Sequence, residues 1–366
     1  MTSSKPNRSR TRAAKRLSQA AKVGLAPGAL IHVGERKTEQ PTITLIEYGD
    51  TELVEYCFTS TEEARAYQTR LPVLWLNVHG LHEPEVMAEI GRRFKLHPLV
   101  LEDILNTNQR PKIDDYGDYL FMVARFFEID SNNDQISSDQ VSLILGPNFV
   151  LTFQERPSGR FDPVRERLRQ NRGQIRKLGA DYLAYSLLDA IVDRYFTILE
   201  NIGERTEELE NLMLEKPKPG SLQTVHQLKR ETLTLRRSIW PLREVINSLT
   251  RADDRFFRPE TRPYLRDIYD HTVHAIESLE ANRDVIAGML DIYLSAVSNR
   301  VNQEVRALTV VAIIFMPATL ISGIFGMNFK IMPLLDLPNG FLIAIGMMAT
   351  VATTLSIVFW RRRWLE

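Results

Sequence analysis

The sequence predicts an α+β membrane protein. A cytoplasmic α/β sandwich-like domain is followed by a helical hairpin and by a very long stalk helix, which continues into the first of two C-terminal transmembrane helices. Three observations support this fold class. Residues 29–156 hold short β-rich runs mixed with helical stretches. Residues 264–316 contain no proline and one glycine. Residues 307–325 and 340–360 carry no charged side chain.

The average composition hides these membrane segments. Lys and Arg together number 46, as do Asp and Glu, and the mean hydropathy is −0.20. Such averages describe an ordinary soluble protein of two or three domains. The single cysteine, Cys57, fits a reducing compartment and excludes a disulfide framework.

Residues 1–24 are predicted to form a basic disordered tail. They include seven Lys and Arg residues and no Asp or Glu. They contain no apolar segment of the kind that a secretory signal requires. A mitochondrial transit peptide is the alternative, because such peptides are also rich in Arg and Ser and poor in acidic residues.

The α/β domain is expected over residues 25–179, with a largely buried sheet. A helical stretch is expected over 84–94, where the sequence reads "PEVMAEIGRRF". The runs rich in β-branched and aromatic residues predict strands, and they lie at 29–34, 42–49, 53–58, 73–78, 119–127 and 141–153.

The hairpin is expected over residues 180–257, where two long helical patterns are separated by the breaker "KPKPGS". The stalk and first span are expected over 258–325. Apolar or weakly polar positions recur there in steps of three and four from residue 265 to residue 308, which predicts one continuous helix. At 1.5 Å per residue this helix is about 80–90 Å long, far more than a bilayer requires. Such a helix needs partners along its length, so we expect oligomerisation.

The two uncharged runs each have about the 20 residues that a membrane-spanning helix needs. They are separated by a loop at 326–339, and residues 361–366 follow the second run. Arg300 and Arg306 precede the first run and Arg361–Arg363 follow the second, whereas the loop holds only Lys330 and Asp336. By the positive-inside rule both termini face the cytoplasm of a cell in whose inner membrane the protein lies.

A pore requires several copies of a chain with only two spans. Positions spaced by three or four place small, polar or flexible side chains on one stripe of the first span, among them Asn302, Leu308, Met316 and Thr319. Small residues also serve helix packing in membranes, which is the competing interpretation. The stripe contains no carboxylate, so we expect a divalent ion to pass with its water, and the Leu308 and Met316 rings to close the path by dewetting.

The segment "SNRVNQEVRALTVVAIIFMPATLISGIFGMNFKIMP" resembles the CorA family of divalent-cation transporters, as do "HPLVLEDILNTNQRPK" and "SIWPLRE". The resemblance covers nearly everything from Gly24 onward. It implies a funnel-shaped homopentamer whose selectivity filter is Gly326, Met327 and Asn328. It also implies that the stripe defined above lines the pore.

The resemblance further implies regulatory carboxylates for intracellular Mg²⁺. These are Asp103 and Asp267, which would meet across protomers, with Glu102 and Asp189 nearby. His271 and His274 share one helical face with Asp267, and they are expected to be helix-surface residues.

Two positions depart from the family pattern. Phe325 and Leu334 stand where the family often has a Tyr and a Glu, so Asp336 is the only carboxylate of the loop. Electrostatic attraction of cations to the pore mouth is therefore expected to be weaker than in the family.

The function implied is passive influx of Mg²⁺, with Co²⁺ and Ni²⁺ as further cargo candidates and Mg²⁺ as regulator. The expected partners are copies of the same chain, divalent cations and membrane lipid, and no nucleic acid. The chain has no nucleotide-binding glycine fingerprint and no nucleophile constellation, so it is not expected to be an enzyme. A zinc transporter of the same superfamily and a membrane-tethered coiled-coil scaffold remain as alternatives.

Overall fold

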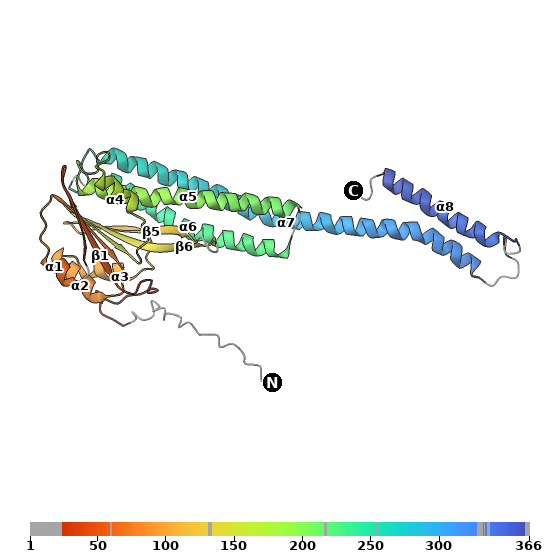
Figure 1. Cartoon of the computed structure of the whole chain (residues 1–366), viewed down its shortest axis with the longest axis horizontal. Helices are drawn as coiled ribbons and strands as arrows, with labels where there is room; N and C mark the ends of the chain where they lie inside the picture. The colour runs from red at the N-terminus through yellow and green to blue at the C-terminus, as the bar shows by residue number, and fades with distance from the viewer. Residues whose placement is uncertain are drawn as a thin grey trace, which may run out of the picture. The chain divides into compact units, whose positions relative to one another are not determined.

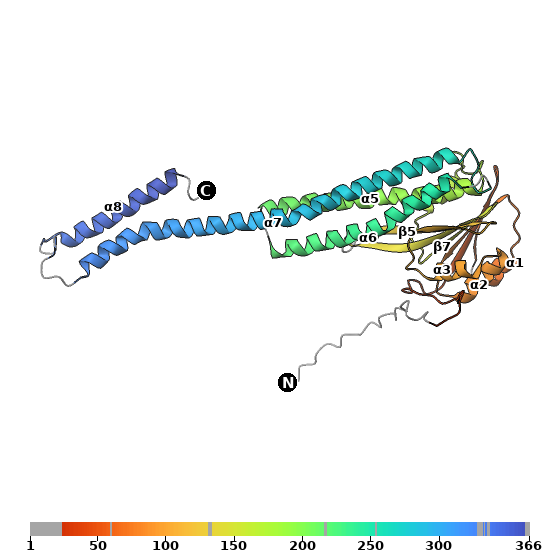
Figure 2. The same ribbon diagram turned by 180° about the vertical axis from the view of Figure 1, so that it is seen from behind.

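The computed structural model describes residues 24–58, 61–130, 134–215, 218–252, 255–327, 332, 334 and 337–362. Figures 1 and 2 show the elements from opposite sides. Their order is β1 (Thr42–Tyr48), β2 (Leu53–Phe58), α1 (Thr61–Ala66), β3 (Val73–His79), α2 (Pro84–Arg93), α3 (Pro98–Leu105), β4 (Lys112–Asp115), β5 (Leu120–Ile129), β6 (Ile136–Leu145), β7 (Phe149–Gln154), α4 (Asp162–Arg169), α5 (Ala180–Glu215), α6 (Pro219–Thr250), α7 (Arg262–Phe325) and α8 (Gly340–Arg361).

The strands form one seven-stranded sheet in the order β2-β1-β3-β7-β6-β5-β4. Only β3 and β7 pair in parallel; the other neighbours pair antiparallel. A parallel pair needs a long connection, and here that connection contains α2, α3 and three strands.

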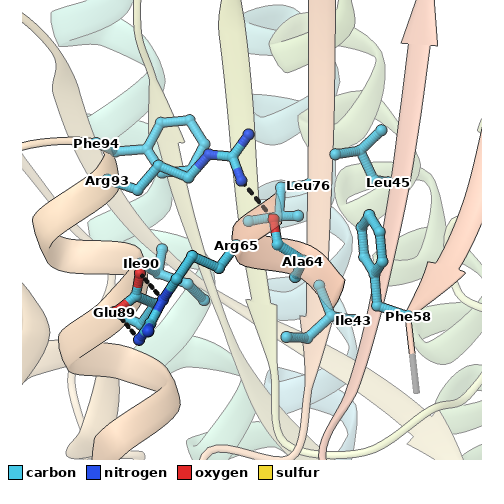
Figure 3. A pocket seen from close by; sticks show the side chains of 10 residues that line it. All are labelled: Ile43, Leu45, Phe58, Ala64, Arg65, Leu76, Glu89, Ile90, Arg93 and Phe94. Carbon is cyan, nitrogen blue, oxygen red and sulfur yellow. Dashed lines mark hydrogen bonds and ion pairs between the residues drawn. The ribbon is translucent and has the colours of Figure 1, made fainter. Parts of the chain in front are cut away.

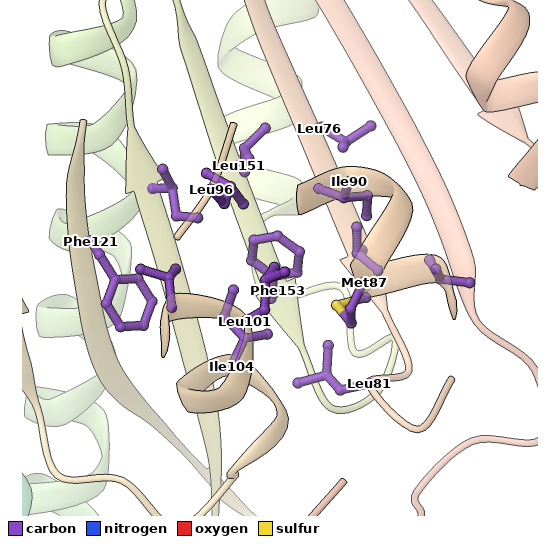
Figure 4. Close-up of a cluster of buried hydrophobic side chains, with 14 of the residues drawn as sticks. Leu76, Leu81, Met87, Ile90, Leu96, Leu101, Ile104, Phe121, Leu151 and Phe153 are labelled. Carbon is purple, nitrogen blue, oxygen red and sulfur yellow. The ribbon is translucent and has the colours of Figure 1, made fainter. Parts of the chain in front are cut away.

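The hydrophobic core lies between this sheet and helices α2 and α3 (Figure 4). Leu76 of β3 and Phe153 of β7 point to this face, where they meet Met87 and Ile90 of α2. The alternate residues of the same strands point to the opposite face, because side chains alternate along a strand. On that face Trp75 of β3 contacts Phe161 at the start of α4, with ring centroids 6.1 Å apart.

The segment 29–34 is not a strand, which corrects the prediction. Val33 forms only an isolated bridge with Asn106, in which its amide donates to the Leu105 carbonyl at 2.9 Å. The next residue, Gly34, has a φ of +148°, and a side chain there would collide with Thr107. The chain therefore turns away before a ladder can form. The strand β4 was not predicted, because only four residues make it and two of them are aspartates.

The helical hairpin and the long helix were predicted correctly. Helix α5 ends at Glu215, directly before the "KPKPGS" breaker, and α6 begins at Pro219 within it. Helix α7 runs unbroken from Arg262 to Phe325. Pro241 lies inside α6 and Pro317 inside α7. A proline within a helix removes one backbone hydrogen bond, which a long, well-supported helix tolerates at the cost of a kink.

Contacts divide the described residues into two compact units. The first holds the chain up to Thr206 together with His226–Val285, and the second holds Glu207–Val225 together with the chain from Ile286 onward. Helices α5, α6 and α7 each contribute to both units. The sheet and the residues that flank it belong to the first unit.

The second unit contains two helices that are long and apolar enough to cross a membrane. They are α8 and the apolar part of α7, and only 6% of the apolar window in each is buried within the chain. A side-chain surface this apolar is too costly to expose to water and is matched to hydrocarbon. The two predicted spans are confirmed.

Candidate metal centre and pore segment

Helices α5 and α7 bring two carboxylates and an imidazole together. Asp189, Asp193 and His271 each offer one ligand atom, and these atoms all lie within 4.8 Å of one another. We call these three residues the Asp-His group. Asp189 and Asp193 are four residues apart, so they share one face of α5. Asp189 and His271 are half-buried and Asp193 is exposed.

The electrostatics of the group favour a cation. Burial and the neighbouring Asp193 carboxylate raise the pKa of Asp189 to about 6. The Nδ1 atom of His271 is buried and has no hydrogen-bond partner among the described residues. The repulsion between the two carboxylates and the unpaired buried nitrogen both cost free energy in the metal-free protein. A divalent cation bound to these groups would reduce both costs. Carboxylate oxygen suits Mg²⁺, while imidazole nitrogen also suits Co²⁺ and Ni²⁺.

Asp267 lies beside this group, one turn before His271 on α7. Its Oδ1 is 3.9 Å from the His271 Nε2, and its side chain is largely exposed. His271 lies partly on the helix surface, as predicted, with its side chain 41% exposed, but it also contacts α5, where its ring centroid is 6.1 Å from that of Phe196. His274 is exposed and does not belong to the group.

Asp103 lies on α3, which begins with His97 as its N-cap and Pro98 in its first turn. The buried face of α3 consists of Val100, Leu101, Ile104 and Leu105, so Asp103 lies on the other side. Its carboxylate accepts from Lys112 Nζ at 2.7 Å and from the Gln109 amide. A metal that binds Asp103 must therefore compete with a lysine of the same chain.

Glu102 precedes Asp103 and has a structural contact. Its Oε2 accepts from the backbone amide of Gly28 at 2.8 Å, which ties the segment before β1 to α3. Neither Glu102 nor Asp103 belongs to the Asp-His group of the described chain.

The stripe predicted to line a pore lies on the exposed surface of α7. Asn302 and Thr319 are exposed, and Leu308 and Met316 are 71% and 67% exposed. Met316 and Thr319 line a shallow hollow whose other residues are Ala312, Phe315, Leu320, Gly323, Ile324 and Met327. The Thr319 hydroxyl donates to the Phe315 carbonyl at 3.0 Å, so its free lone pairs remain as acceptors.

The end of α7 positions the first two residues of the predicted filter. The Gly326 amide donates to the Ser322 carbonyl at 3.0 Å, and the Met327 amide donates to the Ile324 carbonyl at 3.2 Å. Gly326 does not have a left-handed conformation; a Cβ there would lie 3.3 Å from the Ser322 oxygen. Its role is thus close approach rather than an unusual turn. Asn328, the third predicted filter residue, lies outside the described residues.

A separate apolar hollow lies between helices α1 and α2 and the edge of the sheet (Figure 3). Arg65 donates to both carboxylate oxygens of Glu89, and Arg93 donates to the carbonyls of Ala64 and Tyr67. Its rim charges are therefore engaged in holding α1 on α2. This hollow is not a candidate ion site.

Comparison with known proteins places the chain in a family. The model of the CorA-like Mg²⁺ transporter protein family matches residues 72–363. The chain is 45% identical over 351 residues to the cobalt/magnesium transport protein CorA of Thermotoga maritima, which covers 96% of this chain and 99% of that protein. It is 33% identical over 302 residues to the putative metal ion transporter YfjQ of Bacillus subtilis, covering 82% and 93% of the two chains.

The fold agrees with these matches. The complete structure of the CorA magnesium transporter from Methanocaldococcus jannaschii superposes with a TM-score of 0.69 at 21% identity, over 88% of this chain and 98% of that one. These relatives are transporters rather than enzymes. The resemblance carried by the Gly-Met-Asn segment is confirmed: the chain belongs to the CorA family.

Proposed function

We propose that the protein is a homopentameric membrane channel that carries Mg²⁺ and Co²⁺ into the cell. The observation that carries this proposal is the 45% identity, over 96% of the chain, to a protein named for cobalt and magnesium transport. Ni²⁺ is a further cargo candidate. Both termini are proposed to be cytoplasmic, since arginines precede the first span and follow the second, whereas the loop between the spans contains no arginine.

The pore is proposed to form where copies of α7 surround one axis. Two apolar helices enclose no channel, so a ring of copies is needed. The stripe of Asn302, Leu308, Met316 and Thr319 is exposed in the single chain and is therefore available to face such an axis. Because it holds no carboxylate, the stripe would pass a weakly held, hydrated ion.

Gly326, Met327 and Asn328 are proposed to select the ion at the outer mouth. Mg²⁺ releases its water reluctantly, so amide and carbonyl oxygens that bind the hydration shell suit it. Inward flow needs no nucleotide, because a membrane potential favours each elementary charge by about 2.3 kcal/mol per 100 mV.

Regulation is proposed to use Asp103 and Asp267 of neighbouring subunits, with Asp189 close to Asp267. Like-charged carboxylates at an interface repel one another, and bound Mg²⁺ would supply the positive charge that offsets this repulsion. Asp103 and Asp267 would then hold neighbouring subunits in a closed, symmetric ring. Closure by Mg²⁺ requires that these residues bind it better in the closed state than in the open state.

The test is ion uptake into proteoliposomes that contain the full chain, under an inside-negative potential, with Mg²⁺, Co²⁺, Ni²⁺ and Zn²⁺ offered separately. Asn328→Ala should abolish uptake. Asn339→Ala is the matched control, because the Asn339 side chain makes no capping hydrogen bond at the start of α8.

The outcomes separate the alternatives. Uptake of Mg²⁺ and Co²⁺ that depends on Asn328 supports the proposal. Uptake of Zn²⁺ without Mg²⁺ favours a zinc transporter, and no uptake of any ion favours a scaffold.

A further inference from the structure

A cleft beside Asp189 joins the Asp-His group to a set of arginines. Its volume is about 460 Å³, and it lies between β5, the turn before α4, and the middle of α5. Small-molecule sites commonly measure about 300–1,000 Å³. The charged residues that line the cleft are Glu128, Arg160, Arg167, Asp189, Asp193 and Arg194.

Two of these arginines are free to bind a ligand. Glu128 already pairs with Arg156 and Arg160. By contrast, the guanidinium groups of Arg167 and Arg194 make no hydrogen bond or ion pair within the described parts of the chain, and both side chains are half-buried. A guanidinium presents a planar set of donors that matches phosphate oxygens.

Arg160 supplies a second and independent indication. The residue is only 7% exposed, and its guanidinium lies 4.9 Å from the centre of the Phe126 ring, which also lines the cleft. Its Nη1 is buried and has no hydrogen-bond partner among the residues that the structure describes, and the same holds for the Oγ of Ser158 in the same lining. Buried donors are almost always paired, so two unpaired ones in one cleft indicate an acceptor that the described part of the chain does not provide.

The cleft thus carries both kinds of charge at close range. Asp189 and Asp193 would repel a bare anion, and Arg167 would oppose a bare cation, since its charge acts on Asp189. A ligand that carries a divalent metal and an anionic group together satisfies both sets. Mg²⁺ in proteins is commonly held by one or two carboxylates together with the phosphates of a ligand.

We propose that this cleft binds a magnesium-chelated di- or triphosphate, with the metal on Asp189 and Asp193 and the phosphate oxygens on Arg167 and Arg194. The proposal deepens the regulatory role proposed for Asp189 and rests on the proposed function for that role, whereas the binding itself is argued from the cleft. The two arginines lie on different helices, α4 and α5, so they can bind successive phosphates of one chain. The shared ligand chemistry is the polyphosphate group, whether inorganic or part of a nucleotide.

The experiment is isothermal titration calorimetry on the full chain in lipid nanodiscs, with free Mg²⁺ held constant. The probes are MgATP, magnesium pyrophosphate and inorganic phosphate. MgATP, magnesium pyrophosphate or both should bind, and the double variant Arg167→Gln/Arg194→Gln should weaken this binding by at least about 10-fold. The control Arg230→Gln/Arg237→Gln removes two exposed charges of α6 that lie outside the cleft and should bind as the wild type does.

Equal binding of ATP and pyrophosphate assigns the site to polyphosphate in general, and binding of ATP alone assigns it to a nucleotide. No binding of either probe tighter than about 1 mM would overturn the proposal. Equal loss in the cleft and control variants would overturn it as well, as would ATP binding that persists unchanged in EDTA. Inorganic phosphate that binds as tightly as pyrophosphate would also contradict it, by showing a simple anion site.

Mg²⁺ uptake by the same protein in liposomes separates this proposal from the proposed function. Protein that transports Mg²⁺ but binds no polyphosphate sinks the cleft proposal alone. Protein that binds polyphosphate but transports no ion leaves the cleft as a binding site and sinks the channel.

Discussion

Lys112 of β4 holds Asp103 of α3, with the lysine Nζ 2.7 Å from the aspartate Oδ2. The same ammonium lies 2.7 Å from Asp114. The carboxylate proposed to sense Mg²⁺ is therefore already paired within its own chain. A sensor of this kind responds to the balance between an internal cation and an external one, and the internal cation sets its threshold.

Replacing that lysine should lower the threshold. We expect Lys112→Met to reduce the half-inhibitory Mg²⁺ concentration on the cytoplasmic side by about 3- to 10-fold, since a partly exposed ion pair is worth about 1 kcal/mol. Uptake by proteoliposomes at graded internal Mg²⁺ measures this. Lys229→Met, on α6, is the control. An unchanged or higher threshold in Lys112→Met would rule out Asp103 as a sensing ligand.

Metal binding by the Asp-His group should be detectable as a change in the melting temperature of the protein. Because the folded pKa of Asp189 is raised above the usual aspartate value, ionisation of Asp189 destabilises the folded state at pH 7 without metal. Asp189→Asn should thus raise the melting temperature in EDTA by about 1–3 °C. Added Co²⁺ should stabilise the wild type more than this variant.

The pH dependence has a definite sign. The destabilisation of the folded state by ionised Asp189 should shrink as pH falls from 7 through about 6, because the carboxyl takes up its proton, and it should disappear below the pKa that aspartate has in the unfolded chain. Protons should also weaken Co²⁺ binding over that range. The control is Glu200→Gln on the exposed side of α5. If the melting temperatures of Glu200→Gln and Asp189→Asn respond alike to EDTA and Co²⁺, the Asp-His group does not bind metal.

Asp139 of β6 should be important for the stability of the α/β domain. It is 1% exposed, and although burial opposes its ionisation, Arg160 and Lys37 hold its pKa well below the usual range. Arg156 adds a further contact at 2.8 Å. Asp139→Asn should cost about 3–5 kcal/mol, because it removes the buried carboxylate that Arg160 and Lys37 face and leaves Glu128 as the remaining carboxylate partner of the buried Arg160.

Urea denaturation, followed by fluorescence, measures that cost. Because the folded pKa of Asp139 is depressed, its contribution is present above about pH 4 and is lost progressively below it. Asp162→Asn removes an exposed carboxylate and should change stability by less than about 0.5 kcal/mol. A similar small effect for Asp139→Asn would show that the network contributes little.

Cysteine labelling can test which face of α7 lines a pore. Cys57 is the only cysteine, so Cys57→Ser gives a clean background. Thr319→Cys should react with a water-soluble thiol reagent at least about 10-fold faster than Ile314→Cys, because the reaction needs a hydrated thiolate. Ile314 lies on the side of α7 opposite the stripe. Equal labelling rates at the two positions would contradict the proposal that the face of α7 with Thr319 lines a pore.

The large-scale architecture could be predicted from sequence because it depends on long, regular patterns. The spans and the long helix follow from runs of apolar side chains at helical spacing. These runs are long enough that the single Pro317 inside α7 does not obscure the pattern. The short elements depend on local contacts instead. The segment 29–34 looks like a strand by composition, yet Gly34 and the approach of Thr107 prevent pairing.

The candidate site was predicted only in part, for a similar reason. Asp189 and Asp267 were expected to lie close together, but Asp193 and the contact of His271 with α5 were not predicted. Both omissions concern which faces of α5 and α7 meet, and a single sequence does not specify this. The spacing of Asp189 and Asp193 by one helical turn was the available signal. Lys112 could not be foreseen, because β4 was not predicted.

The most direct test of the account is Mg²⁺ uptake by the purified full chain in proteoliposomes with a fluorescent indicator, at low internal Mg²⁺ and an inside-negative potential. The account predicts saturable uptake that rises with the potential and falls when Mg²⁺ is added to the face that carries the cytoplasmic domain. Absence of uptake for both Mg²⁺ and Co²⁺, at low and high internal Mg²⁺, would contradict it.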